Sequence, residues 1–148
     1  MIFISHRGNT DGPIPVYENH PEYISVALRD GFEVEVDVWY IEKKFWLGHD
    51  RPAHEVETWW LTSAPLWCHA KTIEALNMLL DINAHCFFHN TDAVTLTSRA
   101  CIWTYPGFPL TVRSIEVDPE GTKSEYPLFI AGVCSDRIRA IRNAIQRR

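Results

Sequence analysis

The sequence has no excess of positive charge: 14 Lys and Arg stand against 19 Asp and Glu, a formal net charge of −5. A protein that binds duplex nucleic acid or an anionic membrane surface through bulk charge needs the opposite balance. We therefore expect neither as a partner. A small anionic substrate, held by a few placed cations or a metal ion, is compatible with this balance.

Long apolar runs are also absent, and none approaches the roughly 20 residues that a membrane-spanning helix needs. The segment Met1 to Gly8 lacks the basic region, the long apolar stretch and the cleavage site of a signal peptide. We expect a soluble, cytoplasmic protein without a membrane span.

Cysteine is sparse, with four residues and no C-x-x-C pair. Cys68, Cys86 and Cys101 lie within apolar runs, which is typical of buried, reduced thiols in strands. A zinc site or a disulfide framework is the alternative interpretation.

The chain length and composition suit one domain over residues 1–148. Hydrophobic residues make up 46% of the 148 positions, enough to fill a core, and a charged fraction of 22% argues against disorder. No internal repeat, linker or low-complexity segment divides the chain.

Apolar segments alternate with polar turns and amphipathic stretches. Strands are expected at 1–5, 32–40, 45–47, 66–69, 85–89, 101–104, 112–117 and 128–134. Helices are expected at 21–29, from Thr72 to about 82, as a short helix or turn at 93–97, and after a cap at Ser135 or Asp136. Strands separated by single helices indicate a mostly parallel sheet with crossovers.

Six or seven such strands could curl toward a barrel, although the usual eight-stranded barrel takes about 250 residues. We therefore expect an α/β fold, an abbreviated or distorted (β/α) TIM-type barrel with mostly parallel strands. A barrel this short could leave an open edge that a homo-oligomer would cover.

Polar side chains gather where the expected strands end. Basic residues and histidines follow several strands: His6, Arg7, His49, His69, Lys71 and His89. Glu35 and Asp37 share one face of the strand at 32–40, because side chains alternate along a strand. The carboxyl ends of parallel strands form one rim, where active sites are built. We expect these side chains to meet there.

Each of these residue types has a role in phosphate ester chemistry. Glu35 and Asp37 offer hard oxygen ligands to Mg²⁺ or Ca²⁺. Arg7 and Lys71 can neutralise phosphate oxygens. Two histidines can divide proton transfer, because the ordinary pKa of histidine lies near roughly 6.5. A bound metal ion would polarise the phosphoryl group.

The same patterns have structural interpretations. Alternation alone would place Glu35 and Asp37 on a solvent-facing strand face, and His69 could be a core histidine. His89 could belong to a helix-capping turn. The segment 103–107 could pack under a loop or stack on a substrate, and the arginines of 137–148 could form a solvated helix face.

Four short motifs occur in one order: His6-Arg7-Gly8, Glu18-Asn19, Glu35-Val36-Asp37-Val38 and His49-Asp50. In this order the chain resembles the glycerophosphodiester phosphodiesterases of the phospholipase C-like phosphodiesterase superfamily. The resemblance covers residues 1–50, weakens through His69-Ala70-Lys71, and is only suggestive at 133–136.

The resemblance implies a metal-dependent phosphoric diester hydrolase that acts on a small phosphodiester. It implies a catalytic pair (His6 and His49), phosphate-binding cations (Arg7 and Lys71), metal ligands (Glu35 and Asp37) and a supporting Glu18. His69 is predicted as a third metal ligand, and His89 as a second supporting residue. His69 stands where the family usually has a glutamate ligand. Mg²⁺ or Ca²⁺ is expected, and the imidazole favours Mn²⁺ or Zn²⁺ more than an all-oxygen site would.

Two other functions are compatible with the sequence. A phosphate- or metal-binding module derived from this fold could keep the site without turnover, and both the short chain and His69 favour it. A histidine-rich zinc protein of unrelated function is the third interpretation.

Overall fold

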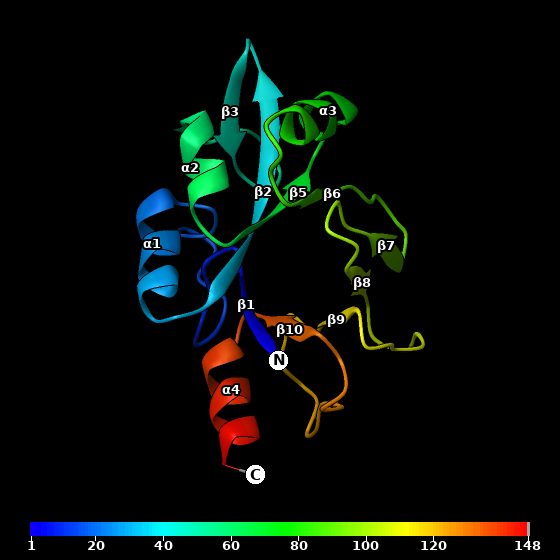
Figure 1. The fold of residues 1–148 in the computed structure, drawn as a ribbon. Helices are drawn as coiled ribbons and strands as arrows, with labels where there is room; N and C mark the ends of the chain where they lie inside the picture. The colour runs from blue at the N-terminus through cyan, green and yellow to red at the C-terminus, as the bar shows by residue number, and fades with distance from the viewer. Residues whose placement is uncertain (148) are drawn as a thin grey trace.

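A ten-stranded sheet runs through the chain in the computed structural model, which describes residues 1–147 (Figure 1). Its strands are β1 (Ile2–His6), β2 (Glu33–Ile41), β3 (Lys44–Leu47), β4 (His54–Val56), β5 (Leu66–Ala70), β6 (Cys86–Phe87), β7 (Val94–Leu96), β8 (Ile102–Thr104), β9 (Ser114–Val117) and β10 (Gly132–Ser135). The helices are α1 (Pro21–Arg29), α2 (Thr58–Ser63), α3 (Ile73–Asp81) and α4 (Ile138–Gln146). The predicted α/β class is confirmed.

Most of the sheet is one parallel series, in the spatial order β6-β5-β2-β1-β10-β9-β8. The antiparallel strands are additions to it: β3 pairs with the second half of β2, β4 pairs with β3, and β7 pairs with β8. The mostly parallel sheet is as predicted. The carboxyl ends of the parallel strands therefore face one side of the molecule.

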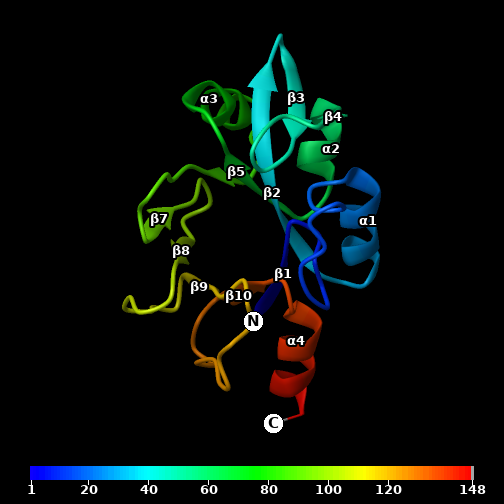
Figure 2. The same cartoon turned by 180° about the vertical axis from the view of Figure 1, so that it is seen from behind.

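The parallel series is strongly curved. The Trp103 ring on β8 lies 5.8 Å from the Trp67 ring on β5 and 4.7 Å from the Phe87 ring on β6, although these strands stand at opposite ends of the series. Figures 1 and 2 show the strands arranged around a common centre. The cluster on this inner face draws on six strands: Ile4, Trp67, Phe87, Trp103, Ile115, Val117 and Cys134.

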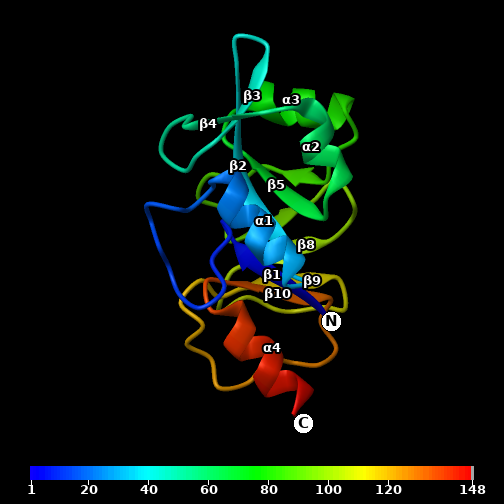
Figure 3. The same ribbon diagram turned by 90° about the vertical axis from the view of Figure 1, so that its left-hand side faces the viewer.

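Helices cover the outer face of β2 and β5. Val34, Val36 and Val38 are fully buried there, as the alternation along this strand predicts. They pack in one cluster with apolar residues of α1, α2 and α3: Ile24, Ala27, Leu61, Ala75 and Leu79. Figure 3 shows α1 and α4 lying against the outside of the sheet. The intervening side chains of β2 must therefore point inward.

Local signals set the helix boundaries that the sequence predicts. α1 spans the expected residues, with Pro21 in its first turn and Gly31 after its end at a φ of 79°, the left-handed conformation that glycine adopts without strain. In α3 the Thr72 hydroxyl accepts a hydrogen bond from the backbone N–H of Ala75 at 3.1 Å, which satisfies a free N–H of the first turn.

The expected helix or turn at 93–97 is wrong, because this segment forms β7. Val94 pairs with Thr104 and Leu96 with Ile102, so the backbone groups find partners on β8. Pairing to a distant segment overrides local propensity here. β4 and α2 were not predicted from the sequence either.

The last strand and the last helix also differ from expectation. The strand begins at Gly132 instead of residue 128, and α4 begins after Arg137, whose side chain makes no cap hydrogen bond. Asp136 does not cap α4, because its carboxylate bonds to other groups. The Ser135 hydroxyl accepts from the backbone N–H of Arg137 at 3.1 Å.

Three smaller expectations can also be compared with the structure. The sequence predicts an apolar stripe on α3 of Ile73, Leu76, Leu79 and Leu80. It is only partly buried, since Leu79 is covered while Ile73 and Leu80 are exposed. The four cysteines are free, and all but Cys101 are buried. The arginines of α4 are engaged at the surface, where Arg139 pairs with Asp11 and Asp30; Arg148 lies outside the described residues.

Within residues 1–147, no helix combines the length and the apolar character that crossing a membrane would require.

Candidate functional site

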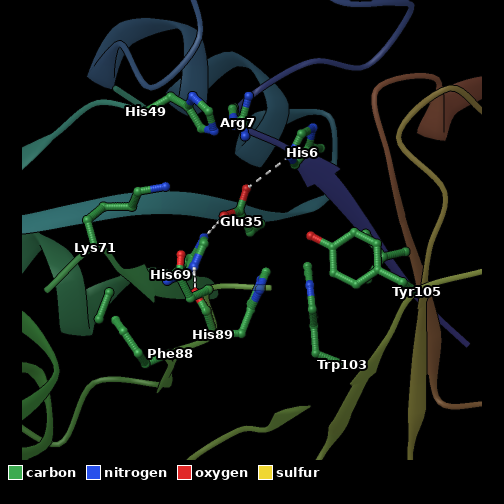
Figure 4. A pocket seen from close by; sticks show the side chains of 13 residues that line it. His6, Arg7, Glu35, His49, His69, Lys71, Phe88, His89, Trp103 and Tyr105 are labelled. Carbon is green, nitrogen blue, oxygen red and sulfur yellow. Dashed lines mark hydrogen bonds and ion pairs between the residues drawn. The ribbon is translucent and has the colours of Figure 1, made fainter. Parts of the chain in front are cut away.

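A cavity of about 350 Å³ opens at the carboxyl ends of the parallel strands (Figure 4). One side of it is charged or basic and the other side is aromatic. Seven residues predicted from the sequence line it: His6, Arg7, Glu35, His49, His69, Lys71 and His89. Side chains from β1, β2, β5 and the loops after β3 and β6 therefore meet at one place, as the strand-end pattern predicts.

The two carboxylates of β2 are buried, so the solvent-facing interpretation of this strand face is wrong. Glu35 is 2% exposed and Asp37 is fully buried. Burying an ionised carboxylate is costly unless cations or hydrogen-bond donors surround it. The surroundings of these two residues therefore decide what each of them can do.

Asp37 is surrounded by donors. One carboxylate oxygen lies 2.9 Å from Arg7 Nε, and the other lies 3.1 Å from Lys71 Nζ and 3.2 Å from His69 Nδ1. Burial alone would raise the pKa of Asp37, but the hydrogen bond from His69 and the charges of Arg7 and Lys71 hold it well below its usual range. Asp37 is therefore an ionised carboxylate.

The Glu18-Asn19 motif builds this environment. Asn19 is buried and has a φ of 61°. Its side-chain NH₂ group donates a hydrogen bond to the Asp37 carboxylate at 2.9 Å. Its side-chain oxygen accepts from the Asp37 backbone N–H, also at 2.9 Å. Glu18 lies 3.2 Å from Arg7 Nη1 and accepts a hydrogen bond from Asn9 at 2.9 Å. Glu18 does not line the main cavity, but it lines a neighbouring depression with Arg7. Its ion pair with Arg7 helps to fix the position of that side chain.

Glu35 is much less compensated. Its Oε2 atom is buried without a hydrogen-bond partner and lies 3.8 Å from His6 Nε2, while Oε1 lies 3.9 Å from His69 Nδ1. Burial and the neighbouring charge of Asp37 raise the pKa of Glu35. A buried carboxylate oxygen without a partner indicates that an additional cation or donor belongs beside it.

His69, on β5, also lies between two acceptors. Its Nε2 atom lies 3.3 Å from the carbonyl oxygen of His89, and its Nδ1 atom lies 3.2 Å from Asp37. Both oxygens only accept, and a neutral ring carries one proton, so it can donate to only one of them. A metal ion beside Asp37 would leave that proton on Nε2, toward the His89 carbonyl.

The donor set fits a divalent cation. Glu35, Asp37 and His69 each place one ligand atom within 4.8 Å of the other two. Two carboxylate oxygens and one imidazole nitrogen are ligands that Mg²⁺, Mn²⁺ and Zn²⁺ accept. The unpartnered Glu35 oxygen is the atom that a cation would satisfy.

His6 is held in one orientation by Asp136. Its Nδ1 atom lies 2.9 Å from Asp136 Oδ1, and this carboxylate also accepts from Asn9 at 2.8 Å. A carboxylate only accepts, so Nδ1 carries the proton and Nε2 faces the cavity as a base. Burial alone would lower the pKa of His6, but Asp136 and Glu35 outweigh it and raise the pKa.

His49 has a similar arrangement at the rim. Its Nδ1 atom lies 2.7 Å from Asp50 Oδ1, and its side chain is 44% exposed. The loop is fixed at Gly48, whose carbonyl accepts from the indole N–H of Trp39 at 2.6 Å. Figure 4 shows His49 and His6 on either side of Arg7 at the cavity.

The aromatic side of the cavity includes His89. Its ring stacks on His69 at 4.4 Å with an interplanar angle of 3°, and the edge of Tyr105 meets it at 5.5 Å. Burial, followed by the charges of His69 and Lys71, lowers the pKa of His89 to about 4. His89 is thus a neutral ring that fixes His69 through stacking and its carbonyl. Phe88, Trp103 and Tyr105 complete this wall.

Two contributors were not predicted as site residues: Asn9 and Asp136. Tyr105 lies in the segment 103–107, for which the sequence left open packing under a loop or stacking on a substrate. Asp136 follows β10, so the strand-end rule that selected the others could also have selected it. It was interpreted as a helix cap, because an aspartate before an apolar helical stripe is the usual capping signal. Asn9 carries no comparable sequence signal.

A scan against protein-family models, a search of curated proteins and a search of solved structures found no match. Function is therefore inferred from the residues of the site.

Proposed function

We propose that this protein is a metal-dependent phosphodiesterase built on an abbreviated (β/α) barrel of the phospholipase C-like type. The observation that carries the proposal is the composition of one cavity. It joins two Asp-oriented histidines, His6 and His49, to a Glu/Asp/His ligand cluster and to Arg7 and Lys71. The order of the motifs in residues 1–50, which resembles the glycerophosphodiester phosphodiesterases, supports it.

The curvature of the parallel series supports the barrel. Side chains from both ends of the series contact each other inside it. The polar residues occupy the carboxyl ends of the strands, where barrel enzymes hold their active sites.

In the proposed reaction, water attacks the phosphorus and the P–O bond to one alcohol breaks. His6 Nε2, deep in the cavity beside Glu35, accepts the proton of the attacking water. His49, at the exposed rim, protonates the departing alkoxide. Paired acid and base groups of this kind contribute about 10²- to 10⁴-fold to a rate.

Glu35, Asp37 and His69 would hold the divalent metal ion. When bound, the metal ion polarises the phosphoryl group and offsets the developing negative charge. Arg7 and Lys71 lie beside Asp37 and line the cavity, so they add positive charge where the phosphate would lie. Charge stabilisation of this preorganised kind is often the largest contribution to catalysis.

The proposal is tested by assaying the purified protein against bis(p-nitrophenyl) phosphate and glycerophosphodiesters with Mg²⁺, Mn²⁺, Ca²⁺ or Zn²⁺ in turn. We expect metal-dependent turnover that falls by about 100-fold or more in His6→Gln and in Glu35→Gln. Glu74→Gln is the matched control, because Glu74 is an exposed glutamate on α3.

Turnover that survives both substitutions would contradict the proposal. Absence of turnover with every metal, together with measurable binding of metal or phosphate, would instead identify a binding module that uses the same residues.

A further inference from the structure

One hydroxyl group of the cavity has no partner within the described chain. Tyr105 follows β8, and Figure 4 shows its hydroxyl oxygen pointing into the cavity toward Glu35. The ring is fixed by its edge contact with His89 at 5.5 Å. Tyr105 is half-buried and lines the cavity, so its free hydroxyl is positioned to donate to a ligand there.

Burial raises the pKa of Tyr105 to about 12, and the charge of Glu35 is the next cause. The hydroxyl therefore keeps its proton at neutral pH and acts as a donor. Being uncharged, it can contact an anion without adding to the charge of the site.

The two cations of the cavity, unlike the Tyr105 hydroxyl, already have partners within the protein. Arg7 is paired with Glu18 and Asp37, and Lys71 is paired with Asp37. Each of them thus makes one side-chain hydrogen bond within the protein. Figure 4 shows Lys71 and Tyr105 on opposite sides of Glu35, so a group bound between them would be contacted from both sides.

We propose that Tyr105 is a substrate-binding residue whose hydroxyl donates a hydrogen bond to a non-bridging oxygen of a phosphoryl group in this cavity. The inference rests on the proposed function, because it takes the ligand to be a phosphate. A hydrogen bond to a charged group is worth about 10- to 100-fold in affinity.

The test is the affinity of the Mg²⁺-loaded protein for inorganic phosphate, measured by isothermal titration calorimetry for the wild type and Tyr105→Phe. We expect Tyr105→Phe to bind phosphate about tenfold or more weakly, with unchanged Mg²⁺ affinity and melting temperature. Tyr40→Phe is the matched control, because Tyr40 lies at a separate groove beside α3 and contacts Phe45; it should bind phosphate like the wild type.

Equal phosphate affinity in Tyr105→Phe and the wild type would overturn the inference, as would absence of phosphate binding by the wild type. A separate outcome tests the proposed function. If phosphate binding depends on Tyr105 but no diester is turned over, this inference stands and the proposed phosphodiesterase activity is contradicted. If diesters are turned over, Tyr105→Phe should raise KM as well.

Discussion

Glu35 and Asp37 are two residues apart on one strand, yet their surroundings give them different chemistry. Asp37 is paired with Arg7, Lys71 and His69, whereas Glu35 has one buried oxygen without a partner. The sequence predicts that both face the rim, because alternation fixes the face. It does not predict this difference, which depends on residues from β1 and β5.

Asp136 is the residue on which the orientation of His6 depends, so Asp136→Asn should impair catalysis. The asparagine keeps the shape but removes the charge that stabilises a protonated His6. We expect kcat on bis(p-nitrophenyl) phosphate to fall by about 10- to 100-fold, while metal affinity changes little. Asp81→Asn, at the end of α3, is the control. An unchanged kcat in Asp136→Asn would contradict the role assigned to this contact.

His85 should make the stability of the fold depend on pH. Its Nε2 atom hydrogen-bonds the Thr97 hydroxyl at 2.9 Å, and burial lowers its pKa from 6.5 to about 4. Between these values the unfolded chain binds more protons than the folded chain. The contribution of His85 is therefore complete above pH 6.5 and is lost as the pH falls toward 4.

Urea unfolding at a series of pH values tests this prediction. His85→Gln can still bond to Thr97 but does not titrate, so its unfolding free energy should fall less steeply between pH 6.5 and 4. Parallel curves for the two proteins would show that His85 does not contribute.

Elements with complete local signals could be predicted, and elements formed by distant pairing could not. α1 has its proline, its apolar stripe and its glycine stop, and it was predicted at its observed bounds. β7 consists of Val94–Leu96, too short for a periodic pattern, and exists because β8 provides its partner. The site follows the same rule. The residues at the strand ends could be predicted from the sequence, but the contact between Asp136 and His6 depends on the pairing of β1 with β10.

The loop after β3 should be sensitive to any side chain at Gly48. Gly48 has a φ of 150°, and an added Cβ would lie 2.1 Å from the Arg51 carbonyl oxygen. Gly48→Ala must therefore move the loop that carries His49. We expect the unfolding free energy to fall by about 1–3 kcal/mol, measured by urea denaturation.

Comparing Gly48→Ala with Gly107→Ala separates the steric cost of an added Cβ from the conformational cost of a positive φ. Gly107 also has a positive φ, of 90°, but an added Cβ there would meet nothing within 4 Å. We expect a smaller loss of stability at Gly107, of about 1 kcal/mol. A Gly48→Ala protein as stable as Gly107→Ala would contradict this description of the loop.

For the whole molecule, the ligand cluster ties two strands together. Glu35 and Asp37 come from β2 and His69 from β5, so a bound ion would stabilise only the folded chain. At a metal concentration about 100 times the dissociation constant, the gain would be about 2.7 kcal/mol.

Thermal unfolding with and without each metal measures this gain. The melting temperature should rise with metal, return on addition of EDTA, and be insensitive to metal in Glu35→Gln. A rise of the same size in Glu35→Gln would place the metal elsewhere.

The four helices within residues 1–147 are unequally distributed, and residues 88–131 contain none. The charged side of the cavity belongs to strands that helices cover, whereas Trp103 and Tyr105 belong to a stretch of short strands and loops. Opening of backbone hydrogen bonds costs less where fewer buried contacts must be broken. Amide protons of β8 and β9 should therefore exchange with deuterium before those of β2 and β5, so that the aromatic side of the cavity opens while the charged side stays closed.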